Sequence, residues 1–336
     1  MNHSLRIIGT FILAISILAG CKKEDSTAFA PGGGDEKKIV IGMIGKSRSN
    51  DVFQAAHAGA LAAATELGPK YGVKVVIDIQ TPTEEDAQKQ AQAIEALTRS
   101  GVHGIALSCS EANTVTPSIN RAVDAGVLVM CFDSDAPQSK RSYYYGTDDV
   151  TCGKRVMEEL ARAMGDKGTI AILAGNQSAP NLQNRVKGVR EELAKHSNMK
   201  EANNGNGVFY HAETPEQAAD AVATAQTTNP GIEGWAFVGG WPLFTRNALR
   251  WPAGSVKVVS MDALPPELPY LESGHVEVLF AQDCYGWGYK SVDMLLNKIV
   301  NGKDPEEGAR VIDPLTRVTK ENAAEYGKNW EKWLKK

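Results

Sequence analysis

From Lys38 onward, runs of apolar residues alternate with stretches in which apolar residues recur every three or four positions. Apolar runs at 39–45, 73–79, 104–107 and 127–132 predict strands, and the stretches between them predict amphipathic helices. A series of strand-helix-strand units with short turns forms a parallel sheet that is wound right-handedly and covered by helices on both faces. The sequence therefore predicts an α/β fold.

The same alternation begins again after the segment 143–148, which we interpret as a connection between two halves. A chain of 336 residues is also longer than one compact domain usually grows. Two similar α/β halves predict two lobes, with the ligand site in the cleft between them. In the second half we expect strands at 169–173, 208–210, 235–238, 256–260, 276–281 and near 310–312, with helices at 215–227 and 242–249 and a last helix ending at Trp333.

Residues 1–21 have the features of an export signal. Arg6 supplies a positive charge, the mostly apolar run 7–18 is too short to span a bilayer, and small residues precede Cys21 in the box Leu18-Ala19-Gly20-Cys21. This box resembles bacterial lipoprotein signals, which implies cleavage before Cys21 and attachment of lipid to its sulfur. An ordinary secretory signal with a chance cysteine is the alternative. We expect residues 22–37 to be a flexible polar tether and the lipid chains to hold the protein on a membrane surface.

If Cys21 carries lipid, Cys109, Cys131, Cys152 and Cys284 remain. Their spacing fits neither a metal site nor a Cys-x-x-Cys pair, and the six histidines show no metal-ligand spacing either. We therefore expect no metal and mostly buried, unpaired thiols. A bridge between Cys109 and Cys131, which both lie near strand ends, stays open as the alternative.

The charge pattern and the known catalytic motifs exclude several classes of function. A formal net charge of −4, without a basic run along a helix, argues against nucleic-acid binding. The first strand carries Gly42-x-x-Gly45 instead of the Gly-x-Gly-x-x-Gly of dinucleotide sites, and neither a phosphate loop nor a Gly-x-Ser-x-Gly elbow is present. Asp133, Asp262 and Glu213 leave an acid/base pair open as the alternative. We nevertheless expect that the chain is not an enzyme and needs no cofactor.

Several polar side chains follow directly after predicted strands. Asp133, Ser134 and Asp135 come directly after the apolar run 127–132. Because ligands of open parallel sheets bind outside the carboxyl ends of the strands, these side chains are placed to meet one. Carboxylates, amides and guanidinium groups suit paired hydrogen bonds to sugar hydroxyls, and flat aromatic rings stack on the C–H face of a sugar. Further candidates lie at 47–53, 181–185, 239–241, Asp262 and Gln282.

Each of these candidates also has an interpretation without a ligand. Asp133 or Ser134 would cap a turn, Phe53 would pack as a helix staple, Arg185 would form a surface ion pair, and Trp241 would pack in the core. The order of the candidates along the chain is more specific than any one of them.

Six ordered segments carry a resemblance to a known family: GMIGKSRSNDVFQAAHAGALAAATELG, VLVMCFDSDAP, YGTDDVTCGK, NRVKG, VVSMDALPP and FAQDCYGWGYKSV. They resemble the ribose-type sugar-binding proteins of bacterial ABC importers, and the resemblance covers essentially everything from Lys38 to the C-terminus. It implies the type I periplasmic-binding fold, in which two Rossmann-like lobes with parallel sheets are joined by a hinge of three crossings, here near 146–148, 282–283 and 311–314. We accordingly expect a first lobe at 38–146 plus 283–312 and a second lobe at 147–282 plus 313–336.

The resemblance also implies a role for individual residues. Asn50 and Phe53 would touch the sugar from the first lobe, where Asp133 would accept hydrogen bonds from its hydroxyls. From the second lobe, Arg185 would donate and Asp262 would accept across from it, while Gln282 would reach the ligand from the hinge.

The chain departs from the ribose receptors at several of these positions. Ser134 stands where they have an arginine, Val52 where they have an aromatic residue, and Gly240, followed by Trp241, where they have an asparagine. We count Ser134 and Trp241 as ligand-binding residues and do not expect ribose itself as the ligand. The Asp-Ser-Asp form resembles receptors for rhamnose-like sugars and for autoinducer-2.

The implied function is that of an extracytoplasmic receptor. It would capture a monosaccharide between its lobes, close around it by hinge motion and deliver it to an ABC permease with its own ATPase subunit, acting as a monomer. A receptor that reports to a chemoreceptor or sensor kinase is the alternative, and a sugar-processing enzyme is a further one. A LacI-type repressor shares the fold, but it would need an N-terminal helix-turn-helix where this chain has an export signal.

Overall fold

The computed structural model describes residues 37–334, which belong to one compact unit. The expected signal peptide, the lipid-anchor residue Cys21 and the tether up to residue 36 lie outside the described residues. Between residues 37 and 334, no helix is both long enough and apolar enough to cross a membrane.

The first lobe is built on a six-stranded sheet in which every neighbouring pair of strands is parallel. Its strands are rich in Ile, Val and other apolar residues, and its central strands are buried, as expected for a parallel sheet covered on both faces. In spatial order the strands are β12 (Arg310–Ile312), β5 (Tyr143–Gly146), β4 (Leu128–Phe132), β3 (Gly104–Leu107), β1 (Lys38–Ile44) and β2 (Lys74–Ile79).

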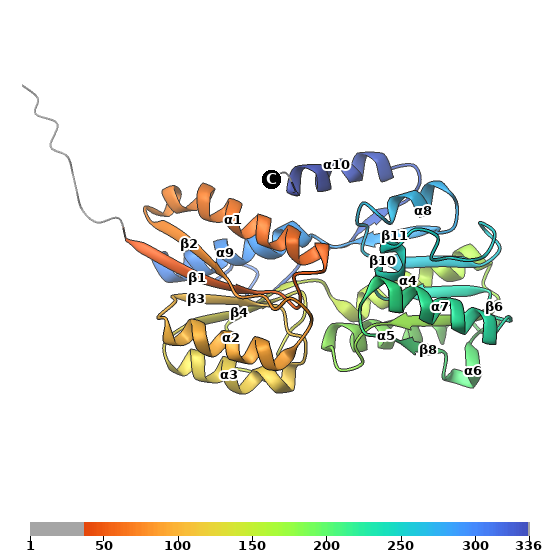
Figure 1. Ribbon diagram of the computed structural model, residues 1–336, viewed down its shortest axis with the longest axis horizontal. Helices are drawn as coiled ribbons and strands as arrows, with labels where there is room; N and C mark the ends of the chain where they lie inside the picture. Colours follow the sequence, from red (N-terminus) through yellow and green to blue (C-terminus); the bar gives the residue numbers. More distant parts are fainter. Residues whose placement is uncertain (1–36, 335–336) are drawn as a thin grey trace, which may run out of the picture. The chain divides into compact units, whose positions relative to one another are not determined.

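Helices cover both faces of this sheet, with α1 (Asp51–Tyr71) and α9 (Cys284–Asn301) on one face and α2 (Ala87–Arg99) and α3 (Ala112–Asp124) on the other (Figure 1). Two glycines allow α1 and α9 to approach closely. A Cβ atom on Gly59 would lie 2.0 Å from the carbonyl oxygen of Tyr285, and one on Gly288 would lie 1.8 Å from that of Ala56. The N-terminus of this closely packed helix α1 lines a cavity between the lobes.

The second lobe is built on a seven-stranded sheet. It is parallel except for its last strand, which runs antiparallel to its neighbour. The strands are β13 (Thr316–Val318), β11 (Val278–Ala281), β10 (Lys257–Met261), β9 (Gly234–Phe237), β6 (Gly168–Ala174) and β7 (Met199–Glu201) in spatial order, with β8 (Val208–Tyr210) also pairing with β6. The helices are α4 (Asp149–Met164), α5 (Pro180–Leu193), α6 (Ala202–Gly205), α7 (Pro215–Thr228), α8 (Leu268–Glu272), α10 (Ala323–Trp333) and the 3₁₀ helix η1 (Trp241–Phe244).

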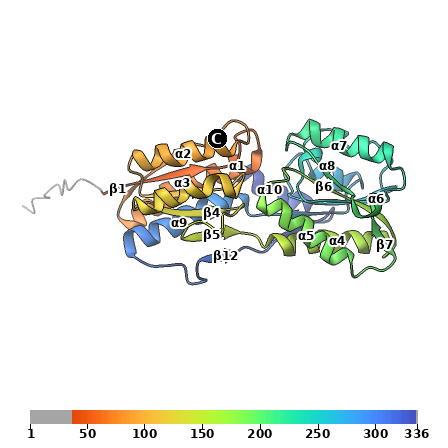
Figure 2. The ribbon, with the colours of Figure 1, turned by 90° about the horizontal axis from the view of Figure 1, so that it is seen from below.

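The chain passes between the two sheets at three places. It leaves the first sheet after β5 to enter α4, returns after β11 to enter α9, and leaves again between β12, which lies beside β5 (Figure 2), and β13. The α/β class with two parallel-sheet lobes, expected from the sequence, is thus confirmed.

The C-terminal helix α10 contacts both lobes. The indole nitrogen of Trp330 donates to the carbonyl oxygen of Ala263 in the second lobe at 2.8 Å, whereas the ring of Trp333 stacks on Tyr285 of α9 with centroids 5.9 Å apart. The last helix therefore packs against elements of both lobes.

Two local predictions were wrong. The segment 143–148, expected as a connection, contains β5, because its tyrosines are buried and pair with β4 and β12. The helix expected at 242–249 is only the short η1, because the chain becomes extended at Thr245 and left-handed at Asn247, with φ of 59°.

Candidate ligand-binding site

A small cavity of about 30 Å³ lies where the two lobes meet. Its walls come from the carboxyl ends of strands in both sheets and from the first turns of α1, α5 and α9. Among the residues predicted from the sequence, those that line it are Asn50, Phe53, Asp133, Arg185, Trp241, Asp262 and Gln282. The cavity is also lined by Lys46, Val52, Asn181, Leu182, Glu213 and Trp287.

Asp133 follows β4 directly and holds a carboxylate in the cavity wall. One oxygen accepts from the hydroxyl of Ser108 at 2.7 Å, and the other accepts from the side-chain amide of Asn181 in the second lobe at 3.3 Å. Its backbone is left-handed, with φ of 55°. Two hydrogen bonds leave this carboxylate with further lone pairs, so it can accept from a ligand hydroxyl.

Arg185 sits on the first turns of α5 and is 2% exposed. Its guanidinium group donates through Nε to Asp149 at 2.9 Å, through Nη1 to the carbonyl oxygen of Val238 at 3.1 Å, and through Nη2 to Gln282 at 2.8 Å. Burial alone would lower the pKa of Arg185, but the nearby carboxylates of Asp149 and Asp133 raise it above its usual value. The arginine is therefore a fixed, charged donor in the cavity wall.

Asp262 follows β10 and is oriented by two donors. Its carboxylate accepts from the backbone N–H of Gly240 and from the side-chain amide of Gln282, both at 2.9 Å. The sequence-based expectation paired Asp262 with Arg185. In the structure, Arg185 forms its ion pair with Asp149 instead, and Gln282 lies between Arg185 and Asp262. Burial raises the pKa of Asp262, while Arg185 and these donors oppose the shift.

Two sets of aromatic rings border the cavity. Phe53, on the first turn of α1, packs 6.1 Å from Trp287 of α9, which packs in turn on Phe132. In the second lobe, Trp241 meets the ring of His211 edge-on at 4.9 Å. Rings from both lobes therefore offer apolar faces beside the polar groups, an arrangement that suits the mixed surface of a sugar.

Of two further predicted residues, Asn50 has a second role besides lining the cavity, and Ser134 lies outside the cavity wall. Asn50 lines the cavity and also caps α1, because its side-chain oxygen accepts from the backbone N–H of Val52 at 3.2 Å. Ser134 is fully buried and does not line the cavity, and within residues 37–334 its hydroxyl has no hydrogen-bond partner. Ser134 therefore lies outside the set of predicted residues that the cavity brings together.

Lys46 is a cavity residue that the sequence did not single out, and Asn181 belongs to the candidate stretch 181–185 but was given no role of its own. Lys46 follows β1, and its ammonium group donates to the side-chain oxygen of Asn181 in the second lobe at 3.2 Å. Because Asn181 also donates to Asp133, three side chains connect the lobes directly. A positive residue just after a buried first strand was the available signal for Lys46, but single lysines at strand ends are common.

Glu213 was considered in the sequence as one member of an open acid/base pair, and it lines the cavity. It lies after β8, where its Oε1 accepts from the backbone N–H of Asn176 at 2.8 Å. Burial raises the pKa of Glu213 to about 8, opposed by Lys46 and reinforced by Glu85.

The cysteines and potential metal ligands do not form a second site. Cys109, Cys131, Cys152 and Cys284 are all free and buried, and the sulfur atoms of Cys109 and Cys131 lie 3.8 Å apart. Within the described chain, no group of three or more His, Cys, Asp or Glu side chains is arranged to hold a metal ion.

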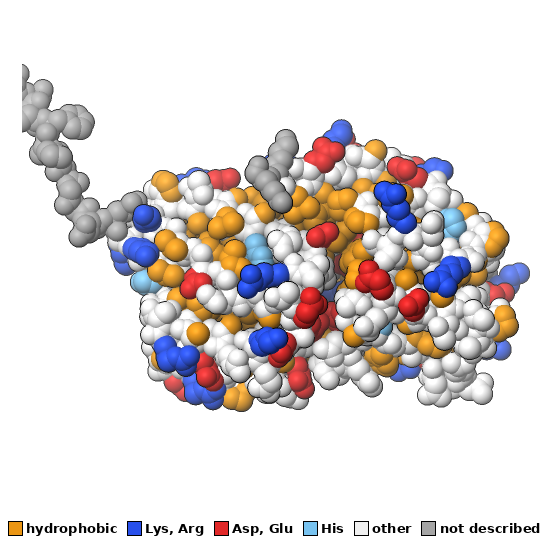
Figure 3. Space-filling model, viewed as in Figure 1, with side chains coloured by type: hydrophobic (Ala, Val, Ile, Leu, Met, Phe, Trp, Pro, Cys, Tyr) orange, Lys and Arg blue, Asp and Glu red, His pale blue; other side chains and the backbone are white. Residues whose placement is uncertain are grey.

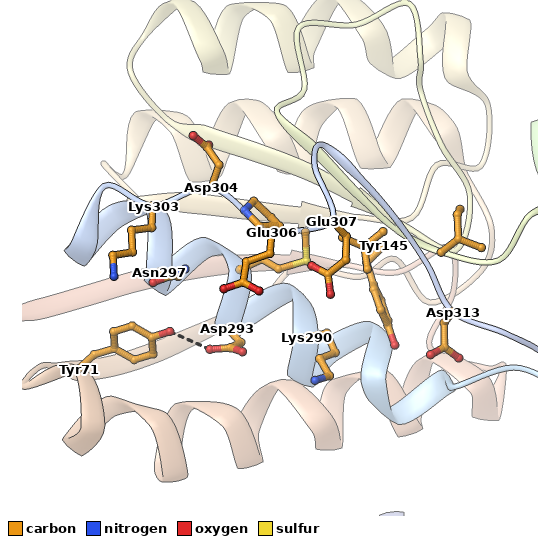
Figure 4. A pocket seen from close by; sticks show the side chains of 14 residues that line it. Tyr71, Tyr145, Lys290, Asp293, Asn297, Lys303, Asp304, Glu306, Glu307 and Asp313 are labelled. Carbon is orange, nitrogen blue, oxygen red and sulfur yellow. Dashed lines mark hydrogen bonds between the residues drawn. The ribbon is translucent and has the colours of Figure 1, made fainter.

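A larger cavity of about 620 Å³ lies on the first lobe beside α9 and β12. Figure 4 shows acidic side chains around it, including Asp293, which accepts from Tyr71 at 2.8 Å. Its walls come from the first lobe and the crossing at Asp313, and none of the residues predicted to bind a ligand lines it. The cavity between the lobes is therefore the better candidate, because polar groups from both lobes converge there.

Comparison with known proteins agrees with the fold. A family model described as the Periplasmic binding protein domain matches residues 41–304. The D-ribose/D-allose-binding protein of Pseudomonas aeruginosa is 25% identical over 298 residues, which cover 84% of this chain and 89% of that protein. These relatives are solute-binding proteins and not enzymes, which confirms the expectation that this chain is not an enzyme.

Solved structures show the same fold. A solute-binding protein from Burkholderia graminis C4D1M, in complex with D-arabinose, is 29% identical with a TM-score of 0.77 and covers 87% of this chain and 99% of that chain. A glucose-galactose binding protein from Geobacillus stearothermophilus, 23% identical with a TM-score of 0.76, covers 85% of this chain and 99% of that chain. The similarity therefore extends over both lobes.

Proposed function

This chain belongs to the periplasmic binding protein family, and on that premise we propose that it is a receptor that binds a monosaccharide or a similar cyclic polyol between its lobes. Membership of this family implies a location outside the cytoplasm. The observation that carries the proposal is the convergence of Asp133 from the first lobe with Arg185 and Asp262 from the second on one cavity. The ribose/allose and arabinose specificities of the relatives support a sugar as the ligand.

The polar groups of the cavity match the hydrogen-bonding needs of a polyol. Asp133 and Asp262 each accept one donor on each carboxylate oxygen and keep further lone pairs for ligand hydroxyls. Arg185 donates once from each of its nitrogens, so a second N–H on each terminal nitrogen stays available. The two lobes thus each supply a carboxylate acceptor, and the second lobe also supplies the Arg185 donor. Together these groups can form paired hydrogen bonds with neighbouring hydroxyls of a sugar.

We propose that binding involves hinge motion. The cavity of about 30 Å³ holds about one water molecule and is too small for a sugar. Lys46, Asn181 and Asp133 also bond directly across the lobes. A sugar must therefore enter a more open form and replace these bonds, and the closed form is favoured because only it contacts the sugar from both sides. The three crossings, with lobes at 38–146 plus 283–312 and 147–282 plus 313–336, would serve as the hinge.

We also propose a membrane location and transport partners for this receptor. Lipid on Cys21 would hold the receptor at a membrane, and the closed monomer would deliver its sugar to an ABC permease with an ATPase subunit. A receptor for a sugar or an autoinducer-2-like ligand that reports to a chemoreceptor or sensor kinase is the second candidate. Mass spectrometry of the membrane-extracted protein tests the anchor: a diacylglyceryl-modified N-terminal peptide that is lost in Cys21→Ser supports it, and an unmodified Cys21 contradicts it.

A thermal-shift screen of the purified protein tests ligand binding. Pentoses, hexoses, deoxysugars, cyclitols, nucleosides and dinucleotides form the panel, because a ligand that binds only the folded state raises the melting temperature. We expect a clear rise with one sugar or cyclitol, accompanied by a smaller radius of gyration in X-ray scattering. A rise only with a nucleoside or dinucleotide would overturn the sugar assignment. A radius of gyration that stays the same when the ligand binds would contradict the proposed hinge motion.

A further inference from the structure

Two glutamates from opposite lobes meet beside the cavity. Glu85 belongs to the connection between β2 and α2 in the first lobe, and Glu213 belongs to the connection between β8 and α7 in the second lobe. A hydrogen bond links their side chains. Because an ionised carboxylate only accepts hydrogen bonds, one of the two carboxyl groups must carry the proton that forms this bond.

Asn176 holds both carboxyl groups in this contact. It follows β6 in the second lobe, and its backbone N–H donates to Oε1 of Glu213 at 2.8 Å. Its side-chain amide donates to Oε1 of Glu85 in the first lobe at 3.2 Å. Glu213 also packs against the preceding residue, since a Cβ atom on Gly175 would lie 2.6 Å from its Oε1. The pair is therefore a defined contact between the lobes, fixed on the side of the second lobe.

The charges around the pair place the proton on Glu213. Burial raises the pKa of Glu213 to about 8, opposed by Lys46 at the end of β1 and reinforced by the negative charge of Glu85. His211 precedes Glu213 and stays neutral, because burial lowers its pKa to about 4, and its Nδ1 accepts from the backbone N–H of Glu213. The other charged residues that line the cavity are Asp133, Arg185 and Asp262.

We propose that the proton between Glu85 and Glu213 keeps the two lobes closed, and that loss of this proton opens the cleft. This inference rests on the proposed receptor function and concerns the regulation of its closure. Without the proton, the pair loses its hydrogen bond and two negative charges face each other. Further acidic side chains gather on the surface near the boundary of the lobes (Figure 3), and their charges act in the same direction.

The sign of the pH dependence follows from the two forms of the protein. Opening exposes Glu213 to water and returns its pKa towards the usual 4.5. The closed form therefore holds a proton that the open form releases. The ratio of open to closed molecules rises by about tenfold per pH unit between 4.5 and 8 and levels off above 8. Since a ligand enters only the open cleft, the proton controls access to the site.

Asp149 is another carboxyl group near the cavity whose pKa is raised by burial. It lies on α4 and pairs with Arg185 on α5, so both partners belong to the second lobe. Titration of Asp149 therefore leaves the contact between Glu85 and Glu213 in place. Substitutions of the two glutamates distinguish the titration of the pair from that of Asp149.

Distances between two spin labels in the full-length protein, in detergent and without ligand, test the inference from about pH 5.5 to 9.5. The labels are attached after Lys89→Cys on α2 and Lys187→Cys on α5, because these lysines are exposed on opposite lobes. The cysteines of residues 37–334 are buried, and the protein without the two substitutions gives the background.

Four variants are compared with the unchanged chain in this measurement. Glu85→Gln and Glu213→Gln replace one titrating group by an amide, which can still donate a hydrogen bond to the other glutamate. Glu84→Gln and Glu216→Gln are the matched controls, because both side chains are exposed and lie near Glu85 and Glu213 in the chain.

We expect a single short distance at the acidic end and a longer distance whose ratio to the short one grows at least tenfold between about pH 6 and 8. Glu85→Gln and Glu213→Gln should keep the short distance at the alkaline end, and both controls should follow the unchanged chain. The inference is wrong if the distances stay the same at every pH, or if Glu213→Gln opens together with the unchanged chain. Because no ligand is present, either result leaves the receptor function standing, and the thermal-shift screen tests that function separately.

Discussion

Arg185 is joined to Asp262 through the side-chain amide of Gln282, which accepts from the arginine at 2.8 Å and donates to the aspartate at 2.9 Å. Gln282 directly follows β11, at the point where the chain crosses from the second lobe to the first. Its amide therefore orients a donor and an acceptor of the site at the same time. A hinge movement at this crossing would also change the geometry of both.

Replacing the amide by a carboxylate tests this arrangement. Gln282→Glu keeps the acceptor for Arg185 but loses the donor for Asp262 and adds a negative charge beside it. We expect a loss of about 1–3 kcal/mol in unfolding free energy, because a buried acceptor loses its partner, and sugar binding weakened at least tenfold. Urea unfolding and calorimetry measure both quantities. Gln217→Glu, on the exposed start of α7, is the control, and equal effects of the two substitutions would contradict the prediction.

The ion pair of Arg185 and Asp149 predicts a strong effect on stability. Arg185→Met leaves the buried carboxyl group of Asp149 without its cation. Breaking a buried pair in this way typically costs about 3–5 kcal/mol. The control is Arg99→Met, because Arg99 and Glu95 are 72% and 38% exposed in their pair and a surface pair contributes no more than about 1 kcal/mol. Urea unfolding should show a clearly larger loss of stability in Arg185→Met than in the control. Similar midpoints would show that the buried pair contributes no more to stability than the exposed pair.

The indole ring of Trp241 packs so closely against Gly239 that it leaves no room for a side chain there. A Cβ atom at Gly239 would lie 2.2 Å from the indole ring of Trp241, which must move if a side chain is added. Gly239→Ala should therefore displace the ring from the cavity wall and weaken sugar binding about tenfold, with a stability loss of about 1–3 kcal/mol from overpacking. At Gly231 a Cβ atom would meet nothing within 4 Å, so Gly231→Ala is the matched control. Tryptophan fluorescence follows the ring, and an affinity unchanged in Gly239→Ala would exclude Trp241 from the site.

The raised pKa of Glu213 predicts a dependence of stability on pH. Its usual pKa of 4.5 rises to about 8 in the folded protein, mainly because of burial. Between these values the folded state holds a proton that the unfolded state has released, so this group makes the protein less stable as the pH rises from 4.5 to 8. Glu213→Gln should gain stability relative to the original chain across this range and level off above it.

Thermal unfolding measured from pH 5 to about 9 checks the prediction. Glu216→Gln should give a curve parallel to that of the unchanged chain, because Glu216 is exposed. A constant difference between the Glu213→Gln variant and the unchanged chain at every pH would show that Glu213 titrates normally.

Much of the fold follows from local pattern. Strands such as Leu128–Phe132 are apolar over their whole length, and helices such as α2 show apolar residues at three- and four-residue steps, so each was predictable from its own residues. Short elements were less predictable. β5 consists of three tyrosines and a glycine, and it is a strand because β4 and β12 supply hydrogen-bond partners from distant parts of the chain.

The site was predictable only in part. Asp133 and Asp262 follow buried strands, and that placement alone brings them to the ligand edge of a parallel sheet. Ser134 follows the same strand as Asp133 but is buried away from the cavity, because successive residues point in different directions. Lys46 and Glu213 are distant in sequence, and no local pattern indicates that they line one cavity.

The sequence by itself determined the two α/β lobes and the residues that end their strands, because apolar periodicity and strand ends are properties of short segments. Only the tertiary structure decided that Arg185 pairs with Asp149, that Gln282 separates it from Asp262, and that Lys46 and Glu213 line one cavity. Charge balance and hydrogen-bond partners depend on distances between residues far apart in the chain, and folding alone sets those distances.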